Sequence, residues 1–371
     1  MNISQKLFSY SFSALLIAIP FSALISNFNS VLIEFLLGIS ILTGLVSHVN
    51  LDKNYFYKNR YQFLYLLFIL GIGILEFSSI KNFIFGIKYE ILYLMIFLFF
   101  NSFEDFKYEK FYGYFINSSL LALAFSLLIW MFSNNSLLVK LGYRDDWSTF
   151  YLNQNQAFCQ KLQGKDLCRF QGFLSSPNHF GLHLLLLNFL SRSLKVKFFS
   201  FVSVFFTFSR SSLLAFLTFF SLKFRNNIKK WQITFAAISF VLVILYSLNY
   251  ANLSTQEHVV KFVENLPVIL ESFWFGHGLN FSGPASRVMQ TLIPESHFLQ
   301  VILNTGVIGF SLFVLSFYNL IKRFWEHKKD NAYILLSLFV PMLFLHPMED
   351  SGLSIVLFAY LAFEEAFLSK E

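Results

Sequence analysis

Long apolar runs recur from one end of the chain to the other, separated by short polar and charged segments. An α-helix needs about 20 mostly apolar residues to cross the roughly 30 Å hydrocarbon core of a bilayer, and most of the runs approach that length. The pattern therefore predicts an all-α, polytopic bundle of about twelve transmembrane helices within a single domain, 1–371. The expected crossings are 7–26, 29–47, 61–79, 83–101, 111–133, 173–191, the two arms of a hairpin at 198–222, 232–250, 297–320, 331–346 and 351–367.

The stretch 198–222 allows two interpretations, because it is apolar throughout except for Arg210 near its middle. As one helix of about 38 Å it would cross the membrane once and place Arg210 near the bilayer centre, at a cost of roughly 2.5–3.5 kcal/mol. As a hairpin it would return to the side on which it began. Ser209–Ser212 would then form a tip that points outward, within a water-filled recess below the outer surface.

The distribution of basic residues favours the hairpin. Short cytoplasmic loops of membrane proteins carry an excess of lysine and arginine. The hairpin places the basic clusters 192–197 and 223–230 on the same side and puts most of the 28 lysines and arginines inside, whereas a single crossing leaves fewer than half of them there. The predicted topology therefore has both termini in the cytoplasm and two long outer loops, 133–172 and 251–296.

Composition agrees with a membrane protein. Hydrophobic residues make up 56% of the chain and charged residues only 13%, whereas soluble domains carry about 25% charged residues. The net charge of +7 is interpreted as a topology signal on the inner face and not as a nucleic-acid-binding surface. The apolar run 7–25 lacks a convincing cleavage site, so we expect a retained first helix in contact with membrane lipids.

The chain has two cysteines, Cys159 and Cys168, and both lie in the first long outer loop. An oxidising compartment outside the cytoplasmic membrane would favour a disulfide that closes a small loop. The alternative is a pair of unbonded thiols.

The fourth crossing contains two ionisable residues, Lys88 and Glu90. Ionisable side chains within a span usually face a cavity or one another, but residues two apart point to different faces of a helix. One interpretation is a structural pairing with another helix. The other is that Lys88 faces an anionic ligand.

Three arginines and a histidine converge on the predicted outer face: Arg169, Arg210, Arg287 and His297. The planar fork of arginine suits phosphate oxygens, and histidine is the usual general base near neutral pH. Each could instead have a structural role at a helix end. The sequence contains neither a metal-ligand spacing nor a phosphate-binding P-loop, so we expect no metal and no cofactor.

Four segments resemble, in their order, spacing and predicted placement, the superfamily of O-antigen ligases and O-antigen polymerases. They are RFQGFLSSPNHFG, FTFSRSSLLAFL, FGHGLNFSG and ESHFLQVILNTGVIGF, and the resemblance covers about residues 165–320. It implies a metal-independent, inverting glycosyltransferase of the bacterial inner membrane, with its active site on the periplasmic side. The donor would be a glycan on undecaprenyl diphosphate, and the acceptor a sugar hydroxyl of the lipid A-core or of a growing glycan.

The resemblance also implies roles for individual residues. Arg210 matches the Ser-Arg motif of the family and would bind the diphosphate, and Arg287 resembles the loop arginine with a similar role. Arg169 and Lys88 are further candidates for the same anion. His297 would be the base that activates the acceptor, although counting back from Gly306 and Gly309 puts Glu295 at the usual histidine position, so Glu295 is the alternative base.

Three classes of function stay open at this point. Within the first, the glycan-transferring enzymes, the Glu-Ser start of the helix at 297 is closer to polymerases, but the sequence favours polymerase and ligase about equally. A twelve-helix transporter or polysaccharide flippase is the second function class, although the two halves show no internal repeat of the kind that transporters often have. A non-catalytic membrane scaffold is the third.

Overall fold

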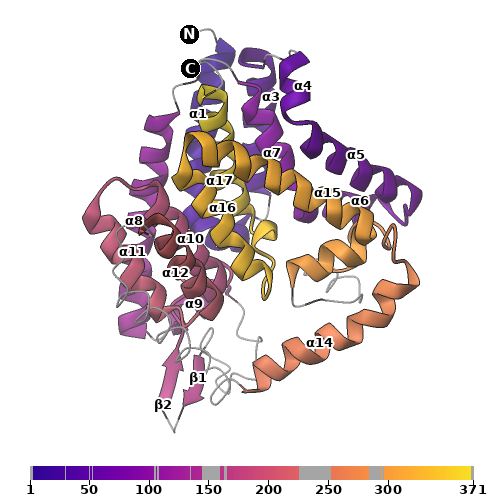
Figure 1. The fold of residues 1–371 in the computed structure, drawn as a ribbon. Coiled ribbons are helices and arrows are strands. Elements are labelled where there is room, and N and C mark those ends of the chain that lie inside the picture. The colour runs from indigo at the N-terminus through magenta and orange to yellow at the C-terminus, as the bar shows by residue number, and fades with distance from the viewer. Residues whose placement is uncertain are drawn as a thin grey trace. The chain divides into compact units, whose positions relative to one another are not determined.

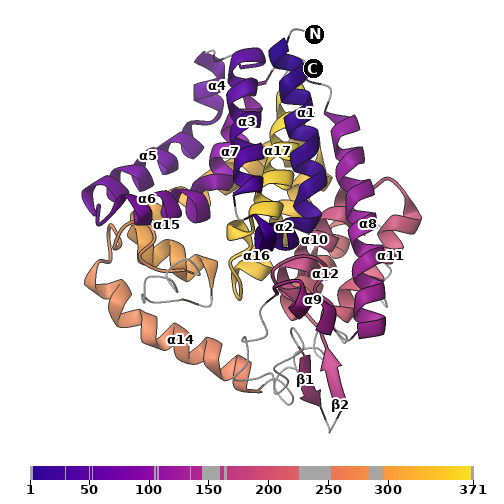
Figure 2. The ribbon, with the colours of Figure 1, turned by 180° about the vertical axis from the view of Figure 1, so that it is seen from behind.

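The computed structural model describes residues 3–29, 31–49, 51, 53–103, 106, 108–133, 135–143, 159–162, 165–224, 252–283, 294 and 296–368. Within these ranges the regular secondary structure is helical apart from one two-stranded hairpin (Figures 1 and 2). Contacts along the chain divide it into two compact units. The first comprises Met1–Asn50 with Ser102–Leu213, and the second comprises Leu51–Asn101 with Leu214–Glu371.

Several helices match the predicted crossings. In the described part of the chain, four stretches are long and apolar enough to cross a membrane: Ile3–Phe28, Ile80–Asn101, Glu109–Ser133 and His297–His327. Two shorter apolar helices, Leu32–Ser47 and Arg60–Leu75, coincide with the expected crossings 29–47 and 61–79. These helices support a helical membrane protein, while the number of twelve remains a prediction. The expected crossing 232–250 lies outside the described residues.

The first unit is built around α1, which packs against α3 and α8. Its elements are α1 (Ile3–Ala18), η1 (Ile19–Phe21), α2 (Ser22–Phe28), α3 (Leu32–Ser47), α8 (Glu109–Ser133), α9 (Ser136–Lys140), β1 (Cys159–Leu162), β2 (Lys165–Cys168), α10 (Pro177–Leu190) and α11 (Leu194–Phe206). The rings of Phe8 and Phe12 stack at 5.5 Å, and the edge of Phe103 meets Phe8 at 5.3 Å. Helix α10 begins as its sequence dictates, because Ser176 caps the His179 N–H and Pro177 occupies the first helical position.

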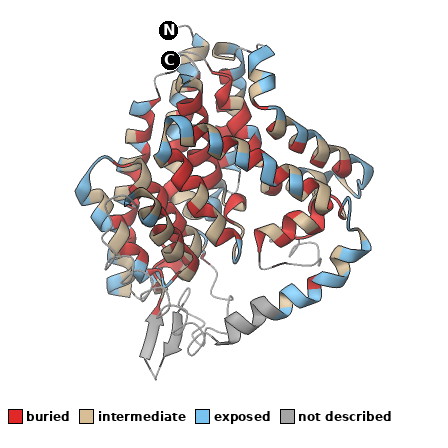
Figure 3. Ribbon diagram, viewed as in Figure 1, coloured by how far each residue is buried: buried red, intermediate tan, exposed pale blue. Residues whose placement is uncertain are grey.

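The second unit is centred on α17, which packs against α7, while α15 packs against α5 and α16. Its elements are α4 (Lys53–Lys58), α5 (Arg60–Leu75), α6 (Ile80–Gly86), the π-helical turn η2 (Ile87–Ile91), α7 (Leu92–Asn101), α14 (Asn252–Glu271), α15 (His297–His327), α16 (Lys329–Met342), η4 (Pro347–Glu349) and α17 (Ser351–Leu368), and α12 (Arg210–Phe224) enters it from the first unit. Buried residues dominate α7 and α17 (Figure 3).

A buried carboxylate joins three helices of the second unit. Glu365 of α17 is 3% exposed and lies 3.1 Å from the Lys58 ammonium and 2.7 Å from the Arg323 guanidinium. Arg323 also donates to the Asn59 side-chain oxygen at 3.3 Å, and Asn101 donates to the same oxygen at 3.3 Å. Because a buried charge is tolerated only when it is paired, this network explains why an acidic residue lies in an otherwise apolar helix.

The stretch 198–222 is divided into two helices and not one. Helix α11 ends at Phe206, α12 begins at Arg210, and Phe208 between them has a left-handed φ of 48°. The structure thus excludes a single continuous helix. The break lies at Thr207–Ser209, slightly before the tip expected at Ser209–Ser212, and Arg210 is the first helical residue after it.

The predicted sidedness of this hairpin can be tested by labelling. In a variant without the native cysteines, single cysteines would replace Lys195, Phe208 or Lys229, since Phe208 lies in the break between α11 and α12 and is 45% exposed. Because the basic clusters are expected inside, an impermeant thiol reagent added to intact cells should label only position 208. Labelling of positions 195 and 229 from opposite faces would show that the segment crosses the membrane once.

The described strands form one antiparallel hairpin in which Cys159 is the register partner of Cys168. Cys168 is disulfide-bonded, and the chain has no other cysteine besides these two. The carbonyl oxygen of Cys168 accepts a hydrogen bond of 2.8 Å from the indole of Trp130 on α8. The hairpin is therefore held at its base by a covalent bond and by this contact with α8.

Reduction of the disulfide should have a modest effect on stability. The loop that it closes is short, so the chain-entropy contribution is roughly 2–3 kcal/mol. Mass spectrometry after alkylation should show two modified thiols only when a reductant has been added first. Full alkylation without reductant would contradict the bond.

Candidate functional site

Helix α15 is broken at Gly306, which has a φ of 64° and a ψ of −172°. The break leaves main-chain N–H and C=O groups on both sides without partners inside the helix. The segment that follows α14 forms hydrogen bonds with these groups. The N–H groups of His277 and Gly278 donate to the carbonyls of Leu303 and Asn304, both at 2.9 Å. In the opposite direction, the Val307 N–H donates to Phe273 O at 2.9 Å. A broken helix within a membrane requires such partners, because lipid offers none.

Two glycines make this approach of main chain to main chain possible. A Cβ added to Gly306 would lie 2.4 Å from the backbone of Trp274, and one added to Gly276 would lie 2.4 Å from the backbone of Asn304 and Thr305. Both glycines have a left-handed φ, which other residues adopt only at a cost. The segment FGHGLNFSG, residues 275–283, can therefore pack closely against the main chain at the break in α15.

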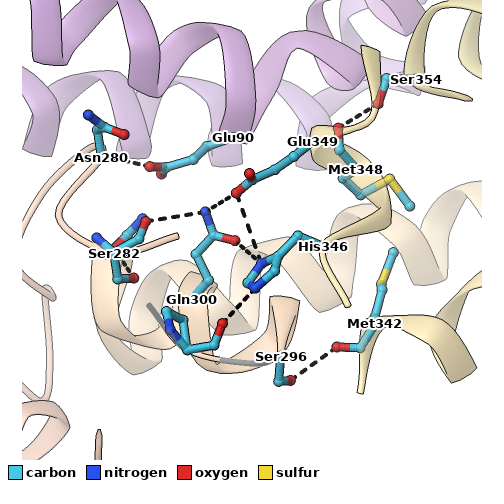
Figure 4. Close-up of polar contacts among 12 residues, drawn as sticks. Glu90, Asn280, Ser282, Ser296, Gln300, Met342, His346, Met348, Glu349 and Ser354 are labelled. Carbon is cyan, nitrogen blue, oxygen red and sulfur yellow. Dashed lines mark hydrogen bonds and ion pairs between the residues drawn. The ribbon is translucent and has the colours of Figure 1, made fainter. Parts of the chain in front are cut away.

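The first half of α15 presents a polar face at this break. Gln300 and Asn304 lie one turn apart and are both buried. The Asn304 side-chain oxygen accepts hydrogen bonds from the Ser282 N–H at 2.9 Å and the Ser282 hydroxyl at 2.6 Å. Close by, a carboxylate oxygen of Glu90 accepts the N–H of Asn280 at 2.6 Å (Figure 4). The glutamate of the fourth crossing is therefore paired with this segment.

A second set of polar side chains connects α15 to the turn after α16 (Figure 4). The Gln300 amide donates to a carboxylate oxygen of Glu349 at 2.5 Å, and its oxygen lies 2.5 Å from His346 Nδ1. His346 Nε2 lies 2.6 Å from the carbonyl oxygen of Pro294. Glu349 and His346 also approach each other, with 4.0 Å between Oε1 and Nδ1.

His297, the first residue of α15, is 1% exposed. Its ring lies at right angles to His346, with 6.1 Å between centroids, and near Phe313 at 5.9 Å. Neither ring nitrogen makes a hydrogen bond of standard geometry among the described residues, although the Gln300 side chain is near enough to interact with the ring. A buried imidazole without a well-formed hydrogen bond is unusual, and it is chemically able to accept or donate a proton.

The first unit holds two of the three arginines of the predicted anion site. Arg169 donates through Nε to the carbonyl of Thr207 at 2.9 Å and through Nη2 to the Asn178 side chain at 2.8 Å. The hydroxyl of Ser212 donates to the Asn178 carbonyl at 3.1 Å. Arg169 is close enough to Arg210 for the two guanidinium groups to repel each other, so the start of α12 concentrates positive charge.

The structure thus brings some of the predicted site residues together. Arg169 and Arg210 share one cluster in the first unit, and His297 belongs to the polar cluster of the second. Lys88 lies in η2, half-buried, with its ammonium 5.2 Å from the ring of Tyr89. Arg287 and Glu295 lie outside the described residues.

Sequence reasoning did not single out Gln300, Asn304, His346 or Glu349 as site residues, although two signals were available. His297, Gln300 and Asn304 fall on one face of their helix, a polar stripe in an apolar span. The sequence HPMED at 346–350 begins on the last residue of the predicted crossing 331–346 and carries three titratable side chains, but no role was predicted for it.

A comparison with models of protein families and with curated proteins finds no match. Among the described residues, no group of three or more histidine, cysteine or acidic side chains is arranged to hold a metal ion. The assignment of function therefore depends on the residues themselves.

Proposed function

We propose that the protein is a glycosyltransferase of the O-antigen ligase and polymerase type, which moves a glycan from a polyprenyl diphosphate to a sugar hydroxyl. The observation that carries the proposal is His297. It is a buried imidazole at the start of an apolar helix, and its nitrogens make no hydrogen bond of standard geometry within the described structure. In the proposed reaction it accepts the proton of the attacking hydroxyl, and the glycosidic bond to the diphosphate breaks as the new one forms.

The arginine cluster supports the second requirement of this reaction, which is an anchor for the diphosphate. The guanidinium of Arg210 at the start of α12 is close enough to that of Arg169 to be repelled by it, and a bound anion would offset this repulsion. Arg169 is held by Asn178 and Thr207, so its position is defined by the fold. Arg210 is then the arginine that we assign to the diphosphate, with Arg287 as its proposed companion.

The proposal is tested by purifying the protein in detergent and supplying a polyprenyl-diphosphate-linked glycan with a fluorescent acceptor. Transfer of the glycan to the acceptor without added metal is expected. Deletion of the gene then distinguishes a polymerase from a ligase. A deletion strain with single repeats on its lipid core indicates that the protein is a polymerase, and a lipid core without glycan indicates a ligase. Intact donor after long incubation, whether the acceptor is a lipid A-core or a growing glycan, would refute the proposal.

The break in α15 favours a second candidate, a lipid-linked glycan flippase or other transporter. Transporters often bind their substrates where a membrane helix is interrupted near the bilayer midplane. Here the interruption at Gly306 adjoins buried Glu90 and Asn304. Reconstitution in liposomes distinguishes the two functions, because a flippase moves the lipid-linked glycan between leaflets without consuming it.

A further inference from the structure

His346 is surrounded by hydrogen-bond acceptors on both sides of its ring. The carbonyl oxygen of Pro294 lies 2.6 Å from Nε2, and the side-chain oxygen of Gln300 lies 2.5 Å from Nδ1. A neutral imidazole has a proton on only one nitrogen. One of these two contacts would then bring a nitrogen lone pair against an oxygen lone pair at hydrogen-bond distance.

The orientation of the Gln300 amide is fixed by Glu349. Its nitrogen donates to the Glu349 carboxylate at 2.5 Å and to the Ser282 carbonyl at 3.3 Å. Turning the amide over would place its oxygen against both of these acceptors. The oxygen must therefore be the atom that faces His346, and it requires a proton on Nδ1.

We propose that Gln300 and Glu349 hold His346 in its doubly protonated, positively charged form, and that the imidazolium acts as a positioning residue for His297. Both ring N–H groups are then used, and the Glu349 carboxylate, 4.0 Å from Nδ1, supplies the balancing charge. Gly283 permits the close packing of this group, because a Cβ there would lie 2.3 Å from the Gln300 nitrogen and 3.0 Å from the Glu349 oxygen.

The imidazolium has a position from which it can act on the start of α15. Pro294, which it binds through Nε2, lies three residues before His297. The same turn is held at two further points, because the Ser296 hydroxyl donates to Met342 O at 3.0 Å and the His297 N–H donates to Leu345 O at 3.2 Å. The three contacts together fix His297 against the end of α16 and the segment that follows it. This role rests on the proposed function, in which His297 is the base.

The charged and titratable groups on the elements that pack near His346 have mixed signs. Glu349 lies on η4 and His297 on α15, while η2, which packs against η4, carries both Lys88 and Glu90. The Glu349 carboxylate, 4.0 Å from Nδ1, is the group that favours a positive charge on His346. Loss of that proton at alkaline pH would replace one hydrogen bond by a repulsive contact and release the turn before His297.

The protonation state can be measured directly by nitrogen NMR of the full-length protein in lipid. His346–Pro347 is the only His-Pro pair in the chain, so labelling histidine and proline identifies this ring without a substitution. At pH 7.5 both ring nitrogens should carry a proton, and in Glu349→Gln one should have lost it. Glu364→Gln is the matched control, because the Glu364 side chain is as little exposed as that of Glu349 and pairs with Lys328. A neutral His346 in the wild-type protein overturns the inference, whatever the function.

The positioning role is tested by the pH dependence of glycan transfer. In Glu349→Gln, the alkaline limb of the profile should move to lower pH, and transfer at pH 7.5 should fall by about 10²-fold, the loss expected for a displaced catalytic group. At acidic pH the variant should recover much of its activity. A loss that is equal at every pH would show a merely structural role and overturn the inference. Absence of transfer in the wild-type protein would refute the proposed function alone, since the NMR measurement would still stand.

Discussion

Replacing His297 by alanine should reduce glycan transfer by about 10²–10⁴-fold, the usual cost of removing a positioned base, while the protein still inserts and folds. The side chain makes ring contacts with Phe313 and His346 but no hydrogen bond of standard geometry within the described residues. Its removal therefore leaves no polar group without a partner. The measurement is the rate of transfer by purified variants at saturating donor.

The alternative base gives the opposite pattern. If Glu295 accepts the proton, Glu295→Gln abolishes transfer and His297→Ala is tolerated. The control for both is His327→Ala, since His327 is an exposed histidine at the other end of the same helix and should leave the rate unchanged.

Substitution of Arg210 tests the diphosphate site independently of the base. A fixed donor that stabilises charge developing in the transition state is commonly worth about 2.7–4 kcal/mol, so Arg210→Ala should lose most transfer, and Arg287→Ala should do the same. Arg210→Lys should recover little, because an ammonium does not reproduce the planar fork. Near-normal transfer by both Arg210→Ala and His297→Ala would contradict the proposed function.

Hydropathy and charge were sufficient to predict the membrane helices in outline. The runs 7–26, 83–101, 111–133 and 297–320 correspond to the four described stretches long enough to span, because the length of an apolar run is a local property of the sequence. The break between α11 and α12 could also be predicted, since one arginine in the middle of an apolar stretch makes a continuous membrane-spanning helix unfavourable. Its position was displaced by about two residues, because Phe208 and not a glycine adopts the left-handed conformation there.

The break in α15 could not be predicted in the same way. Gly306 was noticed only as part of a glycine pair, and the hydropathy of 297–320 continues through it without interruption. What stabilises the break is the pairing of its main chain with Phe273–Gly278, some 30 residues earlier. Gln300, His346 and Glu349 could each have been noticed as polar positions, but their contact with one another could not be predicted, because only the tertiary fold brings their segments together.

Replacing Gly306 by alanine should destabilise the second unit by roughly 2–6 kcal/mol. At a φ of 64° and a ψ of −172° the residue lies in a region that is essentially restricted to glycine, where another residue costs about 1–3 kcal/mol, and overpacking a close contact adds about 1–3 kcal/mol. The contact here is main chain, since the new Cβ would lie 2.4 Å from the carbonyl carbon and oxygen of Trp274. Main chain cannot rotate away as a side chain can, so the segment after α14 would have to separate from α15 and expose the groups that it now bonds.

The matched control is Gly71→Ala in α5 of the same unit, where nothing lies within 4 Å of the added Cβ. Because alanine favours the helix over glycine by up to about 1 kcal/mol, this variant should be as stable as the parent or slightly more so. Thermal unfolding of both variants in the same detergent gives the comparison. Equal midpoints for Gly306→Ala and Gly71→Ala would mean that the two backbones are not in contact at the break. A lower midpoint for Gly306→Ala, reproduced by Gly276→Ala from the opposite side of the same contact, is the expected result.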